Sequence, residues 1–419
     1  MNITNITARQ IIDSRGNPTV EAEVWCGDVF GRAAVPSGAS TGEHEAHELR
    51  DGGDAFGGKG VTQAIQNIEG EIKNALLGIS ADDQYKIDEI LIDIDNTPNK
   101  HHMGANAMLA VSLASAHAAA RVRELPLYKH LNDIAHGPEM SLPMPMMNLL
   151  NGGKHATQSS DFQEYMIVPV GAHSYREAVQ VGAEVFQALK AILHKKGVST
   201  TVGDEGGFAP TVYSNTEMLD LLEEAVEQAG YRGGEEICFA LDVAASEFFE
   251  NGSYRLDAEA RSLLSEDMIE YLSAIVGKYP VISIEDGLSE DEWSSWPILT
   301  QELKGVQVVG DDLLVTNLER LKKAVRLEAG NAILIKPNQI GTLTETIYAI
   351  LEAKKDGFNA VVSHRSGETE DVTIAHLAVG TGAGQIKTGS VSRGERTAKH
   401  NELMRIEDAN PDLIFSNPF

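Results

Sequence analysis

The sequence predicts an α/β fold: a (β/α)8-type barrel with an irregular ββαα start, preceded by a smaller α+β domain. Six predicted strands in the second half each end in an ionisable side chain, and these side chains are separated by 43, 26, 25, 28 and 23 residues. Such spacing matches one strand, one helix and two loops, the repeat of a βα barrel. The first third instead shows alternating strands followed by helices. We therefore predict two domains, residues 1–138 and 139–419.

The N-terminal domain is predicted to contain an antiparallel meander and three helices. Alternation of apolar and polar residues predicts strands in TVEAEVWC and VFGRAAV, and the opening NITNITARQII supplies a third. Apolar residues three and four apart predict helices over 63–77, 82–94 and 105–124. The alanine content of the last helix indicates close packing. The segment HLNDIAHGPEMSLPMPMMN, which contains several prolines and glycines, then marks the domain boundary.

The barrel is predicted to open with two strands in succession, MMNLLN and EYMIVPV, followed by helices over 173–197 and 216–230. The regular units come next, and their strands end at Asp242, Glu285, Asp311, Lys336, His364 and Lys387. Because the carboxyl ends of barrel strands converge on one mouth, three carboxylates and three basic groups would surround a common cavity. Unpaired buried charge costs too much to serve packing. We interpret this mouth as an active site.

Composition argues against several classes of function and location. No apolar run approaches the roughly 20 residues that span a bilayer, and MNITNITARQ has neither the basic region nor the apolar stretch of a signal peptide. A formal charge of -28 argues against nucleic acid and anionic membranes as partners. Cys26 and Cys238 lie in apolar runs without metal-type spacing, which favours buried thiols in a reducing cytoplasm. A secondary pool at the cell surface or outside the cell stays open.

The residue types at the barrel mouth indicate metal-assisted chemistry. Asp242, Glu285 and Asp311 offer hard oxygen donors, which favour Mg²⁺, then Mn²⁺, with Zn²⁺ less suited. A single acid would fit a solvated loop or a helix cap, but three strand-terminal acids fit that explanation poorly. Lys336 and Lys387 face the same cavity, and desolvation is expected to lower the pKa of such a buried lysine. We therefore interpret the carboxylates as metal ligands and the lysines as reactive or substrate-binding groups.

Nine motifs, read together, resemble the enolase family. They are DSRGNPTVE at 13–21, VPSGASTG at 35–42, GDEGGFAP at 203–210, LDVAASEF at 241–248, SIEDGL at 283–288, VGDDL at 309–313, LIKPNQIGTLTET at 334–346, SHRSGETED at 363–371 and IKTGS at 386–390. They occur in family order, and the resemblance runs from about residue 3 to residue 408. It implies a Mg²⁺-dependent lyase of glycolysis and gluconeogenesis that interconverts 2-phospho-D-glycerate and phosphoenolpyruvate. A Lys or His base with one or two Mg²⁺ ions is the general pattern of this superfamily.

The resemblance also implies roles for individual residues. Lys336 would be the base that takes the carbon-bound proton, and Glu205 would assist departure of the hydroxyl group. The implied substrate-binding residues are His155, Gln163, Glu164, His364, Arg365, Ser366 and Lys387. Asp242, Glu285 and Asp311 would hold a first Mg²⁺, and Ser40 in the SGASTG loop would supply oxygens to a second.

Two alternatives stay open among these residues. His364 would also fit an ordinary hydrogen-bonded barrel histidine, and Glu205 would fit a solvated loop glutamate. The chain also departs from the family pattern, because residues 157–160 read Thr-Gln-Ser-Ser where an asparagine-containing run is expected, and Pro337 replaces an aliphatic residue. The first departure bears on how the loop that carries His155 closes.

The resemblance further implies a homo-oligomer, a dimer or an octamer. By position, Arg9 and Glu21 would pair across a dimer interface with Asp408 and Arg405, respectively. Two other functions compete with the lyase: a superfamily relative that acts on a sugar acid, and a binding or scaffold protein. Arg365 and Ser366 argue against the first, because an unphosphorylated substrate leaves no anion for them. Retention of the whole residue set argues against the second as the sole function.

Overall fold

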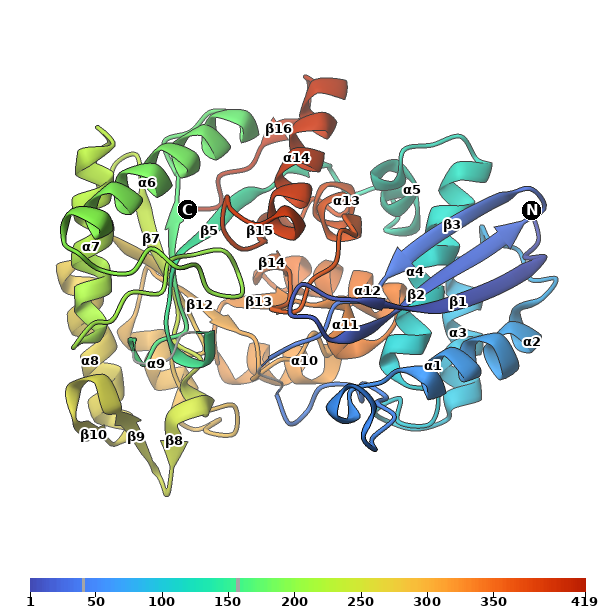
Figure 1. Cartoon of the computed structure of the whole chain (residues 1–419), viewed down its shortest axis with the longest axis horizontal. Helices are drawn as coiled ribbons and strands as arrows, with labels where there is room; N and C mark the ends of the chain where they lie inside the picture. Colours follow the sequence, from blue (N-terminus) through green and yellow to red (C-terminus); the bar gives the residue numbers. More distant parts are fainter. Residues whose placement is uncertain (40–41, 156–158) are drawn as a thin grey trace.

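The computed structural model describes residues 1–39, 42–155 and 159–419. Figure 1 shows a small N-terminal part, drawn in blue to teal, at one end of the long axis and a barrel with surrounding helices toward the other. The predicted α/β class is confirmed, because a closed barrel of eight strands follows a smaller unit of strands and helices. None of the helices within these ranges is long and apolar enough to cross a bilayer.

The N-terminal part begins with the predicted meander. β1 (Asn5–Ile12), β2 (Pro18–Cys26) and β3 (Val29–Ala34) form an antiparallel sheet in the order β1-β2-β3. Helix α4 (Ala105–Val122) packs on this sheet. Gly31 on β3 lies so close to α4 that a Cβ atom there would come within 2.1 Å of the Ala118 amide nitrogen. A residue without a side chain is therefore required at this contact.

The helices of this part follow the predicted positions with one difference. The predicted helix over 63–77 is three segments, α1 (Thr62–Asn67), a π-helical turn η2 (Ile68–Ile72) and α2 (Lys73–Leu76). Asp83 is the N-cap of helix α3 (Gln84–Asp95), and its side chain accepts a hydrogen bond from the Lys86 amide. A short 3-10 turn, η1 (Ala55–Gly58), precedes α1, and α5 (Leu127–Ile134) follows α4. The predicted domain division at 138/139 lies between α5 and β4 (Ser141–Leu142).

The barrel closes in the order β11-β12-β13-β14-β15-β5-β6-β7. Its strands are β5 (Met144–Asn151), β6 (Glu164–Val168), β7 (Cys238–Asp242), β11 (Val281–Glu285), β12 (Gln307–Gly310), β13 (Ala332–Ile335), β14 (Asn359–Ser363) and β15 (Gly384–Lys387). β6 runs antiparallel to both β5 and β7, and the other neighbouring pairs are parallel. Helices α6 (Tyr175–Lys195) and α7 (Asn215–Gln228) separate β6 from β7. The irregular ββαα start is thus confirmed.

The remaining elements complete the C-terminal part. The helices are α8 (Ser265–Lys278), α9 (Trp296–Glu302), α10 (Leu318–Leu327), α11 (Pro337–Ile340), α12 (Leu343–Lys355), α13 (Thr373–Gly380) and α14 (Gly394–Ala409). A small sheet of β8 (Phe249–Glu250), β9 (Ser253–Leu256) and β10 (Arg261–Leu263) follows β7, and β16 (Ile414–Phe415) pairs with β4. Short 3-10 turns lie at η3 (Gly153–His155), η4 (Ala245–Phe248) and η5 (Asp257–Glu259).

Packing in the barrel follows the period-two alternation of strands. On β13, Leu334 belongs to a small apolar cluster shared with residues such as Met144, Ala240 and Val361 from other strands. Its neighbours Ile333 and Ile335 belong instead to the extensive core that the helices also build. The small cluster therefore fills the barrel interior, below the mouth where the charged strand ends lie.

Buried polar contacts join the N-terminal part to the barrel. The Asp88 carboxylate on α3 accepts hydrogen bonds from the Thr344 amide of α12 at 2.8 Å and from the Ser112 hydroxyl of α4 at 2.6 Å. Ser37, after β3, exchanges two backbone hydrogen bonds with Gly367, at 2.8 and 2.9 Å. Because Gly367 follows the predicted site residue Ser366, this pairing brings the N-terminal segment around residue 37 to the barrel mouth.

Candidate active site

The ionisable residues predicted at strand ends do converge on one end of the barrel. Asp242, Glu285 and Lys387 are the last residues of β7, β11 and β15. Asp311, Lys336 and His364 directly follow β12, β13 and β14. Because β6 runs antiparallel, its first residue, Glu164, lies at the same end, opposite Asp242 in the strand register. The barrel topology thus gathers these side chains from distant parts of the sequence.

Lys387 lies among three buried carboxylates. Its Nζ atom is 2.8 Å from Glu285 Oε2, 3.0 Å from Asp242 Oδ2 and 3.1 Å from Glu164 Oε1. Burial disfavours the charged ammonium, but these carboxylates outweigh it and hold the pKa of Lys387 well above its usual value. Burial, and then Asp242, raises the pKa of Glu285 well above its usual range. Three carboxyl groups thus share a single cation.

Lys336 forms an ion pair with Asp311. Burial acts to lower the pKa of Lys336, but the Asp311 carboxylate outweighs it, so the pKa is raised. The expectation that desolvation would lower the pKa of a buried lysine at this mouth is therefore wrong for both Lys336 and Lys387, because the sequence did not show how closely the carboxylates approach. The other carboxylate oxygen of Asp311 accepts a hydrogen bond of 2.8 Å from Gln339.

The three predicted metal ligands lie on the consecutive barrel strands β7, β11 and β12. Glu285 Oε1 is buried and accepts no hydrogen bond from the part of the chain that the structure describes. An unsatisfied carboxylate oxygen in an all-oxygen donor set fits a hard divalent cation. Asp286 and Asp312 lie close by, since one oxygen from each lies within 4.8 Å of one from Asp311. The three predicted ligands, together with the neighbouring Asp286 and Asp312, are thus acidic groups that could hold a divalent metal.

Asp286 supports the Asp311 loop. Its carboxylate accepts hydrogen bonds from the backbone amides of Asp311 at 3.0 Å and of Asp312 at 2.8 Å. Its own φ is 45°, a left-handed conformation that is uncommon for a residue with a side chain. Asp286, in the turn after β11, therefore holds in place the start of the loop that follows β12.

A second group of buried polar side chains surrounds Glu205. Glu164, Glu205 and His364 each place one potential ligand atom within 4.8 Å of the others. Glu205 Oε2 accepts a hydrogen bond of 3.0 Å from Asn148 Nδ2 and lies 3.7 Å from His364 Nε2. Burial, and then the charge of Glu205, raises the pKa of Glu164 well above its usual range. This environment favours one proton shared by the two carboxyl groups.

Arg365 and Ser366 contact residues of the N-terminal part. The Arg365 guanidinium makes two hydrogen bonds to the Glu45 carboxylate, at 2.9 and 3.0 Å. The Ser366 hydroxyl oxygen accepts hydrogen bonds from the Ala39 amide at 2.6 Å and from Arg15 at 3.3 Å. Both parts of the chain therefore build this side of the mouth.

A narrow cavity at the barrel mouth brings the predicted residues together. It is lined by Gly38, Gln163, Glu164, Glu205, Lys336, Ser363, His364, Arg365, Ser366 and Lys387. Both predicted catalytic residues are present, as are the predicted substrate-binding residues whose side chains the structure describes. The backbone of His155 lies in η3. Ser40 falls outside the described residues.

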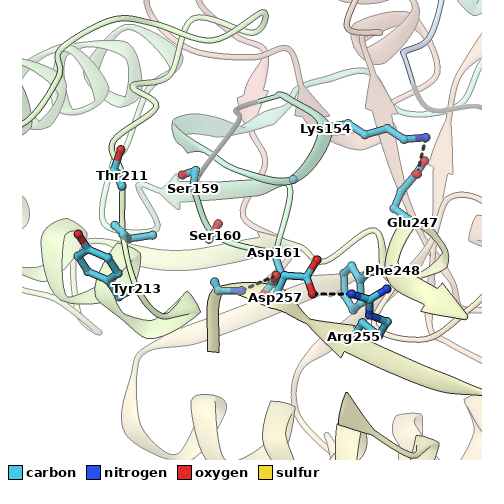
Figure 2. Close-up of a pocket in the computed structure, with 13 residues that line it drawn as sticks. Lys154, Ser159, Ser160, Asp161, Thr211, Tyr213, Glu247, Phe248, Arg255 and Asp257 are labelled. Carbon is cyan, nitrogen blue, oxygen red and sulfur yellow. Dashed lines mark hydrogen bonds and ion pairs between the residues drawn. The ribbon is translucent and has the colours of Figure 1, made fainter. Parts of the chain in front are cut away.

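A wider, open depression of about 770 Å³ lies over η3 and the small β8–β10 sheet (Figure 2). Two ion pairs line it, Lys154 with Glu247 and Arg255 with Asp257 at 3.1 Å. Asp161 accepts hydrogen bonds from the Ala258 amide and the Asn215 side chain. Lys154, Arg255 and Asp257 are at least half exposed, so each ion pair has a solvated member and its charges cost little. The concentrated, buried charge that signals chemistry lies instead in the narrow cavity at the barrel mouth.

Sequence reasoning missed several residues that support the site. Glu45, Asn148, Gln339 and Arg396 contact Arg365, Glu205, Asp311 and His364, respectively. Gln339 lies within the LIKPNQIGTLTET motif and was visible there. Glu45 and Asn148 lie outside the quoted motifs, and Asn148 sits in a strand chosen for its apolar neighbours. Only the folded chain reveals their contacts.

Comparison with protein-family models agrees with the structure. A model described as the enolase C-terminal TIM barrel domain matches residues 139–414, and one described as the enolase N-terminal domain matches residues 3–131. The two matches occur in order and include the meander, the barrel and every residue that lines the narrow cavity. Proteins of this kind bind divalent metals, and the family points to lyase activity. The chain belongs to the enolase family.

Proposed function

We propose that this protein catalyses the reversible dehydration of 2-phospho-D-glycerate to phosphoenolpyruvate. The observation that carries the proposal is that Lys336 and Glu205 line the same narrow cavity as Arg365, Ser366 and Lys387. One cavity thus offers a base, an acid and binding groups for two anions, which this substrate requires. The reaction would serve glycolysis and gluconeogenesis in the cytoplasm.

Lys336 is assigned to remove the proton from C2. It can do so only as the neutral amine, and its ion pair with Asp311 opposes loss of the ammonium proton. Asp311 is also assigned as a metal ligand, and sharing its carboxylate with a divalent cation would weaken its hold on the Lys336 ammonium proton. When bound by Asp242, Glu285 and Asp311, Mg²⁺ would supply positive charge to the substrate carboxylate as that group becomes more negative.

Glu205 is assigned to the second half of the reaction. The C3–O bond breaks as the electron pair from C2 forms the C2=C3 double bond, and the hydroxyl group leaves as water with a proton from Glu205. Glu164 beside it favours a protonated carboxyl group in this pair. Asn148 donates a hydrogen bond to Glu205 Oε2 and so orients the acid.

The two anionic groups of the substrate have separate partners. Arg365 and Ser366 suit the phosphate oxygens, since a planar guanidinium and a hydroxyl group are well matched to them. Lys387 would hold the substrate carboxylate. An unphosphorylated sugar acid would leave Arg365 and Ser366 without their anion, so the phosphorylated substrate is favoured.

We also propose two Mg²⁺ ions per active site and a homodimeric or octameric assembly. Ser40 and His155 are assigned to the second ion and to the substrate by family resemblance. Within this chain Arg9 pairs with Glu21 at 2.5 Å and with Glu23 at 3.0 Å. We propose that Arg9 pairs with Asp408 and Glu21 with Arg405 across a dimer interface that includes the N-terminal part. Within the chain, Asp408 pairs with Arg176 and Arg405 with Glu402.

The experiment follows formation of phosphoenolpyruvate by its absorbance, with purified protein and 2-phospho-D-glycerate. We expect turnover with Mg²⁺ and none after chelation with EDTA, with recovery when Mg²⁺ is restored. The Lys336→Met variant, prepared in the same way, should be inactive and so exclude a contaminating enzyme. Absence of turnover on this substrate, together with dehydration of an unphosphorylated sugar acid, would overturn the proposal in favour of the superfamily alternative.

A further inference from the structure

Arg396, near the start of α14, is a fully buried arginine that connects three segments of the active site. Its Nη1 atom lies 2.5 Å from His364 Nδ1 and 2.6 Å from the Arg365 carbonyl oxygen. Its Nη2 atom donates to the carbonyl oxygens of Ser366 at 2.7 Å and Asp204 at 3.1 Å. These carbonyls belong to Ser366 itself and to the neighbours of His364 and Glu205. One guanidinium therefore ties the segment that carries the proposed acid to the segment that carries the phosphate-binding groups.

The contact between Arg396 and His364 restricts which ring nitrogen of His364 carries a proton. A guanidinium donates hydrogen bonds and accepts none, so Nδ1 of the imidazole must be the acceptor. A neutral imidazole whose Nδ1 accepts carries its single proton on Nε2. A charged imidazolium would direct an Nδ1–H group at the guanidinium. Burial, together with the positive charges of Arg396, Lys387 and Lys336, opposes that form, although Glu205 favours it.

The opposite ring nitrogen faces the proposed acid. His364 Nε2 lies 3.7 Å from Glu205 Oε2 and has no hydrogen-bond partner in the described part of the chain. Both the imidazole and the carboxyl group are almost completely buried, at 1% and 4% side-chain exposure. Among the described residues, Glu164 also belongs to this cluster, and the charges of Lys387 and Lys336 act on His364 from the same cavity. A proton on Nε2 would point toward the space beside Glu205, where a hydrogen-bond donor stabilises a carboxylate.

We propose that Arg396 is a positioning residue that fixes His364 as the neutral Nε2–H tautomer, so that His364 acts as a hydrogen-bond donor toward Glu205 and not as a base. The role given to Glu205 rests on the proposed function, whereas the tautomer assigned to His364 rests on its contact with Arg396. After Glu205 gives its proton to the leaving hydroxyl group, the Nε2–H group would stabilise the carboxylate that forms. The same guanidinium also donates a hydrogen bond to the Asp204 carbonyl oxygen, so it fixes the position of Glu205 relative to His364.

The direct test is ¹⁵N NMR of the full-length protein labelled at histidine, with the His364 signals assigned by their loss in His364→Gln. The nitrogen coupled to both carbon-bound ring protons is Nε2, so the protonated nitrogen can be identified. We expect Nε2 to be protonated and Nδ1 unprotonated from pH 6 to pH 8. Protonation at Nδ1, or a titrating imidazolium in that range, would overturn the proposal. This readout needs no turnover, so it stays decisive if the proposed reaction is wrong.

Two variants test the part played by Arg396. Lysine at this position can only donate, so Arg396→Lys should keep the Nε2–H tautomer, whereas the amide of Arg396→Gln can also accept from Nδ1–H and should give a mixture. Arg393→Lys is the matched control, because Arg393 donates to the carbonyls of Gly203 and Ser14 but does not contact His364. Arg393→Lys should leave the tautomer unchanged.

The kinetic consequence separates positioning from general damage. In Arg396→Gln we expect kcat to fall about tenfold or more, with KM changed less than about twofold and partial recovery in Arg396→Lys. An unchanged tautomer and unchanged kcat in a folded Arg396→Gln would overturn the role of Arg396. If Arg396→Gln does not fold, the spectrum of the wild-type protein and that of Arg396→Lys still decide the tautomer.

Discussion

Charged side chains gather in two regions of this molecule that differ in their exposure to water. At the barrel mouth, Lys387 meets three carboxylates, and the side chains in these contacts are at most 5% exposed. On the N-terminal sheet, Arg9 and Arg32 meet Glu21 and Glu23, but the two arginines are 44% and 48% exposed. The contacts have similar lengths, so distance alone does not distinguish the two regions.

This difference in exposure identifies the cluster that carries function. Exposed ion pairs are solvated whether or not they form, so each stabilises the fold by only about 0–1 kcal/mol. Buried charges lose their hydration, and the attraction between them often fails to offset that cost. A buried cluster with more carboxylates than cations, as around Lys387, is therefore poorly explained by stability. It is well explained by binding a metal ion and an anionic substrate.

The largest expected effect separates the two proposed proton-transfer groups at the mouth. Lys336→Ala should lose turnover and also exchange of the C2 hydrogen with deuterated water. Glu205→Gln should lose turnover while retaining C2 exchange, because proton removal precedes loss of the hydroxyl group. Both losses should reach at least about 100-fold. Mass spectrometry of recovered substrate measures the exchange, and normal exchange in Lys336→Ala with none in Glu205→Gln would show that the roles are reversed.

Metal binding should also depend on the mouth. Asp242→Ala removes one of three proposed oxygen ligands, and we expect tight Mg²⁺ binding to disappear in calorimetric titration. Ser40→Ala is the matched control, since its hydroxyl group is assigned to a second, weaker ion and the tight site should persist. Full-affinity Mg²⁺ binding by Asp242→Ala would remove that residue from the ligand set.

The stability of the metal-free protein gives a smaller but direct comparison of the two regions. Lys387→Met leaves buried carboxylates without their cation, and we expect a loss of about 3–5 kcal/mol in the free energy of unfolding. Arg9→Met should cost about 0–1 kcal/mol, because Arg9 is itself 44% exposed and Arg32 still contacts both glutamates. Urea denaturation in EDTA measures both. Equal losses in the two variants would break the distinction drawn here between buried and exposed clusters.

The smallest expected effect concerns pH and the exposed cluster. The Arg9 hydrogen bond lowers the pKa of Glu23 to about 2, against the effect of burial and with help from Arg32. A carboxyl group with a depressed folded pKa stabilises the fold above its unfolded pKa, and this contribution is lost as the pH falls toward 2. Glu23→Gln should therefore cost about 0–1 kcal/mol at pH 7, given the exposure of both arginines, and less at pH 3.

Urea denaturation at the two pH values checks this prediction. A cost well above about 1 kcal/mol at pH 7 would indicate that the cluster is shielded from water in an oligomer. The proposed pairing of Arg9 with Asp408 and of Glu21 with Arg405 across a dimer requires such shielding. A cost that grows as the pH falls would contradict the assigned direction of the pKa shift. Glu89→Gln, which removes an exposed partner of Lys86 on α3, serves as the control.

Much of the fold could be predicted from the sequence, because the local patterns agree with the tertiary structure. Alternation predicted β1 to β3, and the regular spacing of strand-end charges predicted the barrel units. The π-helical turn η2 was not predicted, since apolar spacing over 63–77 does not distinguish a continuous helix from one with an inserted turn. The β8–β10 sheet was also missed, because its strands are short and lie within a connection between regular elements.

The order of residues along the chain places ionisable side chains at the strand ends, and barrel closure then requires that they meet. Their protonation and their supporting contacts follow from the folded structure alone, because these depend on distances of a few ångströms between residues far apart in the chain. Lys336 illustrates this: burial alone would lower its pKa, yet contact with Asp311 raises it. Arg396 is the stronger case, since its guanidinium reaches His364 and the backbone beside Glu205 only after α14 packs on the barrel.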